Sequence, residues 1–245
     1  MQQPAAGTRA RTNLQWVLGF TLLMTATAAV GASERPASGP ADRFLAAREE
    51  PVTQYRAYRR MHARSERFNQ EAWLEAWTEL DKSGFRYTIV SEKGSEYVRN
   101  KVLRAILKRE QELVADGECG RSEITADNYE FRAAPEGGEH HVLLKPKRKD
   151  VLLVDGRMVL SEDGSELLRV EGRLSKNPSF WTSLVNVVRR YARLDGVRVP
   201  VSTESVAKVK FAGTSRLEVH YEYETINGRP VRVAARQVDS PSAAR

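Results

Sequence analysis

Histidine and cysteine are the residue types best suited to metal binding or nucleophilic chemistry, and this sequence has few of them. His140 and His141 are adjacent, and neighbouring side chains on a strand point to opposite faces, so the pair is poorly placed to share a metal ion. His62 and His220 are isolated in the sequence. Cys119 is the single cysteine and has no recognisable base near it in the sequence. We therefore predict no metal site.

Recognisable catalytic motifs are also missing. The sequence contains no nucleophile elbow, no phosphate-cradling glycine loop and no zinc signature. Asp163 and Glu166 are carboxylates in a predicted turn, and such a pair becomes catalytic only when a cleft surrounds it. We therefore predict a protein that is not an enzyme and needs no cofactor, with no catalytic residue.

The N-terminal 32 residues predict export. Arg9 and Arg11 precede an apolar stretch at residues 16–30, and Val30-Gly31-Ala32 provides small residues for cleavage after Ala32. The apolar stretch is shorter than the roughly 20 residues that span a bilayer, so an uncleaved anchor is the weaker alternative. We expect a signal peptide at residues 1–32, a bacterial periplasmic location and no membrane span after cleavage.

The charge pattern argues against a nucleic-acid partner. The formal net charge is +7, and removal of residues 1–32 lowers it by two, because Arg9 and Arg11 are the only charged residues there. The remaining basic residues are interleaved with Asp and Glu along the chain, which is typical of a solvated surface. Weak attraction to anionic lipid headgroups is compatible with this balance.

The rest of the chain is predicted to form a single domain. Residues 33–43 are rich in Pro, Ser, Gly and Ala and suggest a flexible leader, and residues 239–245 suggest a disordered tail. Residues 44–238 then form the domain. Within it, residues 44–80 fit either a helix or two strands, because Trp73 and Trp77 satisfy both periodicities.

One helix is expected at residues 95–115. Ser95 is a good N-cap, and Gly117 is well placed to end the helix. The apolar residues recur at helical spacing and leave charged residues on the other side, so this helix should pack on the face of a sheet. The apolar stripe comprises Val98, Val102, Leu103, Ala105, Ile106 and Leu113.

The second half of the chain predicts consecutive strands joined by tight turns. Asp155-Gly156 suggests a hairpin turn between strands at 151–154 and 157–160, and Asp195-Gly196 and Asn227-Gly228 suggest two more turns. Residues 217–224 alternate strictly between apolar and polar. The expected fold is mainly antiparallel β with α (α+β), a curved incomplete β-barrel, or half-barrel, packed over one or more helices.

Aromatic residues are the main candidates for a ligand site. If the sheet curves, they would crowd its inner face and line an apolar cavity for acyl chains, although filling an ordinary core is the simpler interpretation. The candidate lining residues are Phe85, Tyr87, Tyr191, Phe211, Tyr221 and Tyr223, and Trp73 and Trp77 are expected on the same face.

Three segments resemble one family. EGRLSKNPSFW (171–181), NVVRRYARLDGVRVPVST (186–203) and LEVHYEYETINGRPV (217–231) resemble bacterial exported proteins of the LolA-like, outer-membrane lipoprotein-sorting group. The resemblance implies an incomplete antiparallel barrel wrapped over helices, and lipids, lipoprotein acyl chains or envelope transport proteins as partners. These segments are strand sequences rather than site motifs, so no site residue is carried over.

Three functions follow from these observations. The first is a periplasmic carrier or chaperone that holds an acyl chain or lipoprotein in the half-barrel. The second is a non-catalytic periplasmic interaction or sensor domain with the same fold and a filled core. An envelope hydrolase ranks last, because no residue pattern supports it.

Overall fold

The computed structural model describes residues 39–47, 49–134, 140–180, 182–210 and 213–232. The expected signal peptide at 1–32, the tail at 239–245 and the candidate residue Phe211 lie outside these ranges. Within them, no helix is both long enough and apolar enough to cross a membrane.

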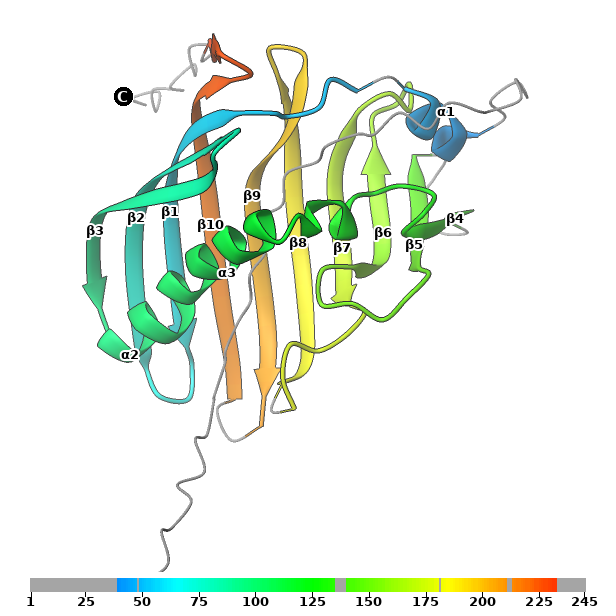
Figure 1. The fold of residues 1–245 in the computed structure, drawn as a ribbon. Helices are drawn as coiled ribbons and strands as arrows, with labels where there is room; N and C mark the ends of the chain where they lie inside the picture. The colour runs from blue at the N-terminus through cyan, green and yellow to red at the C-terminus, as the bar shows by residue number, and fades with distance from the viewer. Residues whose placement is uncertain (1–38, 48, 135–139, 181, 211–212, 233–245) are drawn as a thin grey trace, which may run out of the picture.

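One antiparallel sheet dominates the described part of the chain (Figure 1). Its strand order is β3-β2-β1-β10-β9-β8-β7-β6-β5-β4, and β11 pairs with β10. No pairing joins β3 to β4, so the sheet is open among the described residues. The strands are β1 (Tyr55–Ser65), β2 (Gln70–Asp81), β3 (Gly84–Gly94), β4 (Tyr129–Ala133), β5 (His141–Pro146), β6 (Val154–Leu160), β7 (Leu167–Leu174), β8 (Thr182–Leu194), β9 (Val197–Val209), β10 (Gly213–Ile226) and β11 (Arg229–Pro230).

The predicted helix is confirmed, and it crosses one face of the sheet. It consists of α2 (Glu96–Val98), a π-helical turn η1 (Arg99–Leu103) and α3 (Arg104–Ala115). The Ser95 hydroxyl accepts a hydrogen bond from the Val98 amide, and Gly117 follows the helix at φ 68°. We call the face that the helix covers the concave face, because the sheet curves toward the helix (Figure 1).

The topology explains why a helix lies there. β3 and β4 are consecutive in the sequence but form opposite edges of the sheet. Ten strands spaced about 4.8 Å apart would place these edges about 43 Å apart in a flat sheet. The helical segment from Glu96 to Ala115 advances about 30 Å at about 1.5 Å per residue, so it covers most of that span. The chain therefore has to cross the face of the sheet.

Two shorter helices complete the described chain. η2 (Glu118–Ser122) is a 3-10 helix between α3 and β4. α1 (Pro40–Ala46) has proline in its first turn and buries Phe44. Residues 40–43, which were expected to be part of a flexible leader, therefore belong to this helix.

The ambiguous N-terminal region forms two strands, β1 and β2, joined in register from Tyr55↔Leu80 to Ser65↔Gln70. The expectation that Trp73 and Trp77 face the core is wrong. Ala72, Leu74 and Ala76 are buried on the concave face, so the intervening tryptophans lie on the convex face. Strand alternation separates the two faces of β2 but does not say which of them is buried. The small residues Ala72 and Ala76 occupy buried positions and allow the helix to approach that face closely.

The hairpin expected at Asp155-Gly156 is also wrong, because both residues lie within β6. Gly156 pairs with Gly172 of β7. A Cβ atom added to Gly156 would lie 2.1 Å from the Glu171 carbonyl oxygen and 2.6 Å from Gly172 Cα. This glycine therefore permits a close approach of two strands. In contrast, Asp195-Gly196 and Asn227-Gly228 have positive φ at both residues, as two-residue hairpin turns require.

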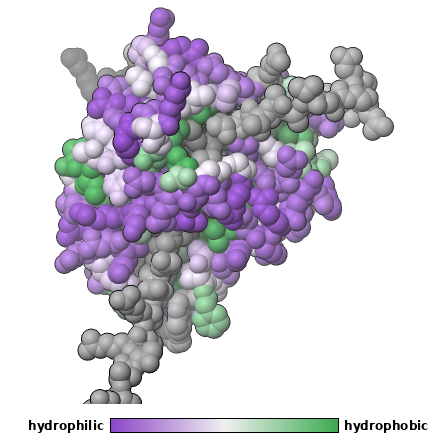
Figure 2. Space-filling model, in the orientation of Figure 1, coloured by the Kyte–Doolittle hydropathy of each residue, from purple (hydrophilic) through white to green (hydrophobic). Residues whose placement is uncertain are grey.

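The apolar residues form two clusters on the concave face. The first contains residues of β1, β2, β3, β10 and the helix, together with the start of β9. The second contains residues of β4–β8, α1 and the end of β9. The outward side of α3, with Lys108, Gln111 and Glu112 exposed, forms a hydrophilic band across the molecule (Figure 2).

Candidate functional site

The structure divides the predicted aromatic site residues between the two apolar clusters. Phe85 and Tyr87 of β3 and Tyr221 and Tyr223 of β10 belong to the first cluster, beneath the helix. Tyr191 of β8 belongs to the second cluster. The four candidate aromatic residues in the first cluster form two contacting pairs. The ring centroids are 6.3 Å apart for Phe85–Tyr87 and 6.4 Å apart for Tyr221–Tyr223.

A charged pair lies at the centre of these aromatic residues. Arg59 of β1 and Glu110 of α3 are buried, with side chains 1% and 4% exposed. The Arg59 guanidinium donates to Glu110 Oε2 at 2.6 Å and Oε1 at 2.9 Å, and to the Tyr55 hydroxyl at 2.7 Å. Its Cζ lies 5.2 Å from the Phe85 ring centroid and 5.0 Å from that of Tyr221. The candidate lining is therefore not purely apolar.

The electrostatics of this pair follow from burial and close opposite charge. Burial alone would lower the pKa of Arg59, but the Glu110 carboxylate outweighs it and holds that pKa well above its ordinary value. Burial also raises the pKa of Tyr55, although Arg59 opposes that rise. Tyr55 therefore stays a neutral phenol that can donate to Glu110, at a separation of 3.4 Å.

A second polar group lies where the two apolar clusters meet. We call it the central polar patch: Arg189 of β8 with Thr203 and Ser205 of β9, all buried on the concave face. Arg189 is directly opposite Thr203 in the β8–β9 register. Burial acts to lower the pKa of Arg189, but Tyr191, which hydrogen-bonds the guanidinium, and the nearby Tyr221 shift it upward.

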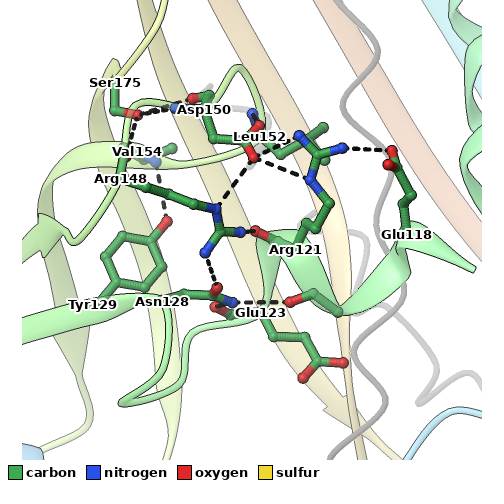
Figure 3. A network of polar contacts seen from close by, with 11 residues as sticks. Glu118, Arg121, Glu123, Asn128, Tyr129, Arg148, Asp150, Leu152, Val154 and Ser175 are labelled. Atoms are coloured by element: carbon green, nitrogen blue, oxygen red, sulfur yellow. Dashed lines mark hydrogen bonds and ion pairs between the residues drawn. The ribbon is translucent and has the colours of Figure 1, made fainter.

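The connection from α3 back to the sheet is held by a polar network (Figure 3). Its centre is Asp150, which is 3% exposed. Asp150 Oδ2 accepts from Arg121 at 2.8 Å, and Oδ1 accepts from the Leu152 amide at 3.0 Å. Arg148 donates to Asn128 Oδ1 at 2.6 Å. These bonds join η2, the start of β4 and the β5–β6 loop.

The network explains how one end of the helix is anchored. Burial would raise the pKa of Asp150, but the Leu152 amide and the Arg121 guanidinium lower it overall. The Asp150 amide donates to the Ser175 hydroxyl at 2.9 Å, which adds the end of β7 to the network. Because its carboxylate oxygens are occupied by these donors, we interpret the network as structural.

A pocket of about 370 Å³ lies on the convex face and is lined by residues of β1, β2, β3 and β10. Trp73 lies in it between two cationic or ionisable groups. The His62 ring stacks on Trp73 with centroids 4.6 Å apart, and Lys93 Nζ lies 4.9 Å from the Trp73 ring centroid. His220 also lines the pocket. The two histidines that are isolated in the sequence therefore lie in one pocket.

The charged groups of this pocket already make internal contacts. Glu75 accepts from the Ser91 hydroxyl at 2.8 Å and from the Tyr58 hydroxyl at 3.0 Å. These two bonds lower the pKa of Glu75. His62 Nε2 lies 3.4 Å from Glu71 Oε2.

The remaining chemical candidates do not line this pocket. His140 precedes β5 and His141 is its first residue. Asp163 lies in the turn before β7, where Ser161 and Ser165 lower its pKa to about 2. The side chain of Cys119 is not among those described. Within the described residues, no three His, Cys, Asp or Glu side chains are grouped so that they could hold a metal ion.

Comparison with known proteins finds no matching family model and no matching curated sequence.

The sequence interpretation missed Arg59, Glu110, Thr203 and Ser205, although a local signal existed for each. Arg59 interrupts the alternating buried series Tyr55, Ala57, Met61 and Ala63. Glu110 lies on the helical stripe between Ile106 and Leu113, and Thr203 and Ser205 continue the alternation of Ala207 and Val209.

Proposed function

We propose that this protein is an exported carrier that holds acyl chains of a lipid or lipoprotein on the concave face of a LolA-like half-barrel. The observation that carries the proposal is an open antiparallel sheet whose concave apolar face is covered by a single amphipathic helix. An acyl chain needs a dry, concave and deformable surface, and the apolar side chains between the sheet and the helix provide such a surface.

The placement of the aromatic residues supports this proposal. Phe85, Tyr87, Tyr221 and Tyr223 gather beneath the helix, on the face that a cargo would enter. The predicted signal peptide and the absence of a catalytic motif agree with a binding role in the periplasm, with envelope transport proteins as further partners.

The first experiment is native mass spectrometry of the protein purified from the periplasm under mild conditions. We expect an additional mass that is removed by extraction with organic solvent. A protein that carries no such mass, even after incubation with phospholipid and a triacylated peptide, would contradict the carrier proposal.

Two matched variants connect the bound mass to one face. Tyr87→Ser removes a partly buried ring from the concave cluster, and Trp73→Ser removes a ring from the convex face. We expect Tyr87→Ser to lower the fraction of protein that carries lipid, whereas Trp73→Ser retains it. Equal loss in both variants would place the binding elsewhere.

The convex pocket supports a second candidate, a periplasmic interaction domain with the same fold. Its 370 Å³ volume and its tryptophan suit a side chain of a protein partner. A lipid-free protein that loses a co-purifying protein partner in Trp73→Ser but not in Tyr87→Ser would favour this function.

A further inference from the structure

Two buried hydroxyl groups in the central polar patch lack a hydrogen-bond partner. Thr203 is 1% exposed and Ser205 is 5% exposed. Neither Thr203 Oγ1 nor Ser205 Oγ has a partner in the described structure. Leaving a buried hydroxyl without a hydrogen-bond partner destabilises the folded protein, so two such groups at successive inward positions of one strand call for an explanation.

A structural role would normally give these hydroxyls a backbone partner. Thr78 on β2 shows this arrangement: it is fully buried, and its hydroxyl donates to the Ala57 carbonyl at 3.1 Å. Ser175, which is also buried, likewise donates to the Asp150 carbonyl at 2.9 Å. Thr203 and Ser205 make no such bond, so their hydroxyls remain available to a molecule on the concave face.

The neighbours of the two hydroxyls define the chemistry of that molecule. Arg189 lies opposite Thr203 and brings a positive charge to the patch. An arginine side chain only donates hydrogen bonds, and a threonine or serine hydroxyl can donate one. Donors at neighbouring positions of one sheet face match a group that only accepts hydrogen bonds, and an anionic oxygen group does so with the added benefit of charge.

Apolar surface borders the patch on both sides. Val219 and Leu217 of β10 lie opposite Thr203 and Ser205, and both belong to the first apolar cluster. Val187 of β8 lies opposite Ser205 on the other side and belongs to the second cluster. A molecule whose polar group is held at the patch would therefore have apolar side chains of both clusters beside it.

We infer that the central polar patch binds the anionic oxygen group of an amphiphile whose apolar chain lies against the flanking clusters. This inference rests on the proposed carrier function and adds the class of its cargo. Both the carboxylate of a fatty acid and the phosphate of a phospholipid have the required chemistry.

The test uses the double variant Thr203→Val, Ser205→Ala, which removes both hydroxyls with little change in shape, and Thr78→Val as the matched control. The probes are dodecanoate, dodecyl phosphate and dodecanol, which share one chain length, and binding to the delipidated exported protein is measured by calorimetry. Stability without a probe is measured by urea unfolding.

We expect the wild-type protein to bind at least one anion more tightly than dodecanol. In the double variant, affinity for that anion should fall about tenfold, and affinity for dodecanol should stay the same. The double variant without a probe should be as stable as the wild-type protein or more stable, because unsatisfied hydroxyls are removed, whereas Thr78→Val should be less stable.

The outcomes separate this inference from the function on which it rests. If all three probes bind equally in wild type and double variant, the carrier proposal stands and the anion site is refuted. If no probe binds, both fail. A double variant destabilised as much as Thr78→Val, with anion affinity unchanged, would assign the hydroxyls a structural role. Tighter binding of dodecanoate would identify a fatty acid as the source of the anionic group, and tighter binding of dodecyl phosphate would identify a phospholipid.

Discussion

At the scale of the residue, the unusual feature is a full ion pair inside an apolar core. Arg59 and Glu110 are both buried, and Tyr55 hydrogen-bonds each of them. Removing two charges from water is costly, and such a pair contributes little net stability compared with apolar residues of the same shape. The pair instead constrains how α3 sits on β1, because the fork of the guanidinium must meet both carboxylate oxygens.

A double-mutant cycle tests this interpretation. Arg59→Met or Glu110→Leu alone should lower the free energy of unfolding by about 3–5 kcal/mol, because each leaves one buried charge uncompensated. The double variant should lie within about 1–2 kcal/mol of the wild-type protein. Urea unfolding measures all three. Arg60→Ala, which breaks the exposed pair with Glu222, is the control and should cost less than about 1 kcal/mol.

Simple addition of the two single effects in the double variant would contradict this coupling, and would show that the side chains pack independently.

Asp150 leads to a prediction about pH. Its pKa is lowered in the folded protein, so its contribution to stability is present above the unfolded pKa of about 3.9 and is lost as the pH falls through the lower folded value. Asp150→Asn should therefore be less stable than the wild-type protein by about 2–3 kcal/mol at pH 6–7. The difference in urea unfolding free energy should narrow below about pH 4. A difference in unfolding free energy that does not change with pH would show that the carboxylate charge of Asp150 does not contribute to stability.

At the scale of the element, the sequence predicts those features that depend only on neighbouring residues. The N-cap and the apolar stripe predict the helix at 95–115. Residues that tolerate positive φ predict the turns at Asp195-Gly196 and Asn227-Gly228. Asp155-Gly156 carries the same dipeptide, yet it lies within a strand. The conformation of Gly156 depends on its pairing with Gly172 of β7, and no local sequence pattern predicts that pairing.

The candidate site shows the same division. The alternation of β10 predicted that Tyr221 and Tyr223 share the buried face. That Arg59 meets Glu110 could not be predicted, because the two residues are 51 positions apart and only the crossing of the helix over β1 brings them together. For β2, alternation defined two faces but did not say which one the helix would cover.

The Gly156–Gly172 approach is an element-scale prediction. Gly156→Ala should lower the free energy of unfolding by about 2–4 kcal/mol, because the new methyl would overlap the backbone of β7 and force the strands apart. Gly120→Ala is the matched control, since its methyl would meet only Glu123 Oε1 at 4.0 Å. Thermal unfolding compares the two. Equal effects would mean that β6 and β7 separate without cost.

At the scale of the whole molecule, the sheet is assembled from two distant parts of the chain. β1–β3 form one end, β4–β10 form the rest, and the joining pair is β1 with β10. The helix that carries the chain between the two edges also covers the concave face. The cover and the connection are therefore the same segment, fixed at one end by the Asp150 network and at the other by Glu92, which pairs with Arg99 and Arg104.

The β1–β10 pairing has a consequence for the order of folding. It joins Tyr55 to Ile226 and Ser65 to Ser215, so contacts at the middle of the sheet close very long loops. Such contacts form slowly, because the chain must lose the entropy of loop closure before the strand contacts can stabilise it. A chain that emerges from a translocation channel N-terminus first would have β1 unpaired on one side until β10 had also crossed. If the protein is exported as we propose, it would complete its sheet only after nearly all of it had left the cytoplasm, with the edge of β1 open to chaperones in the meantime.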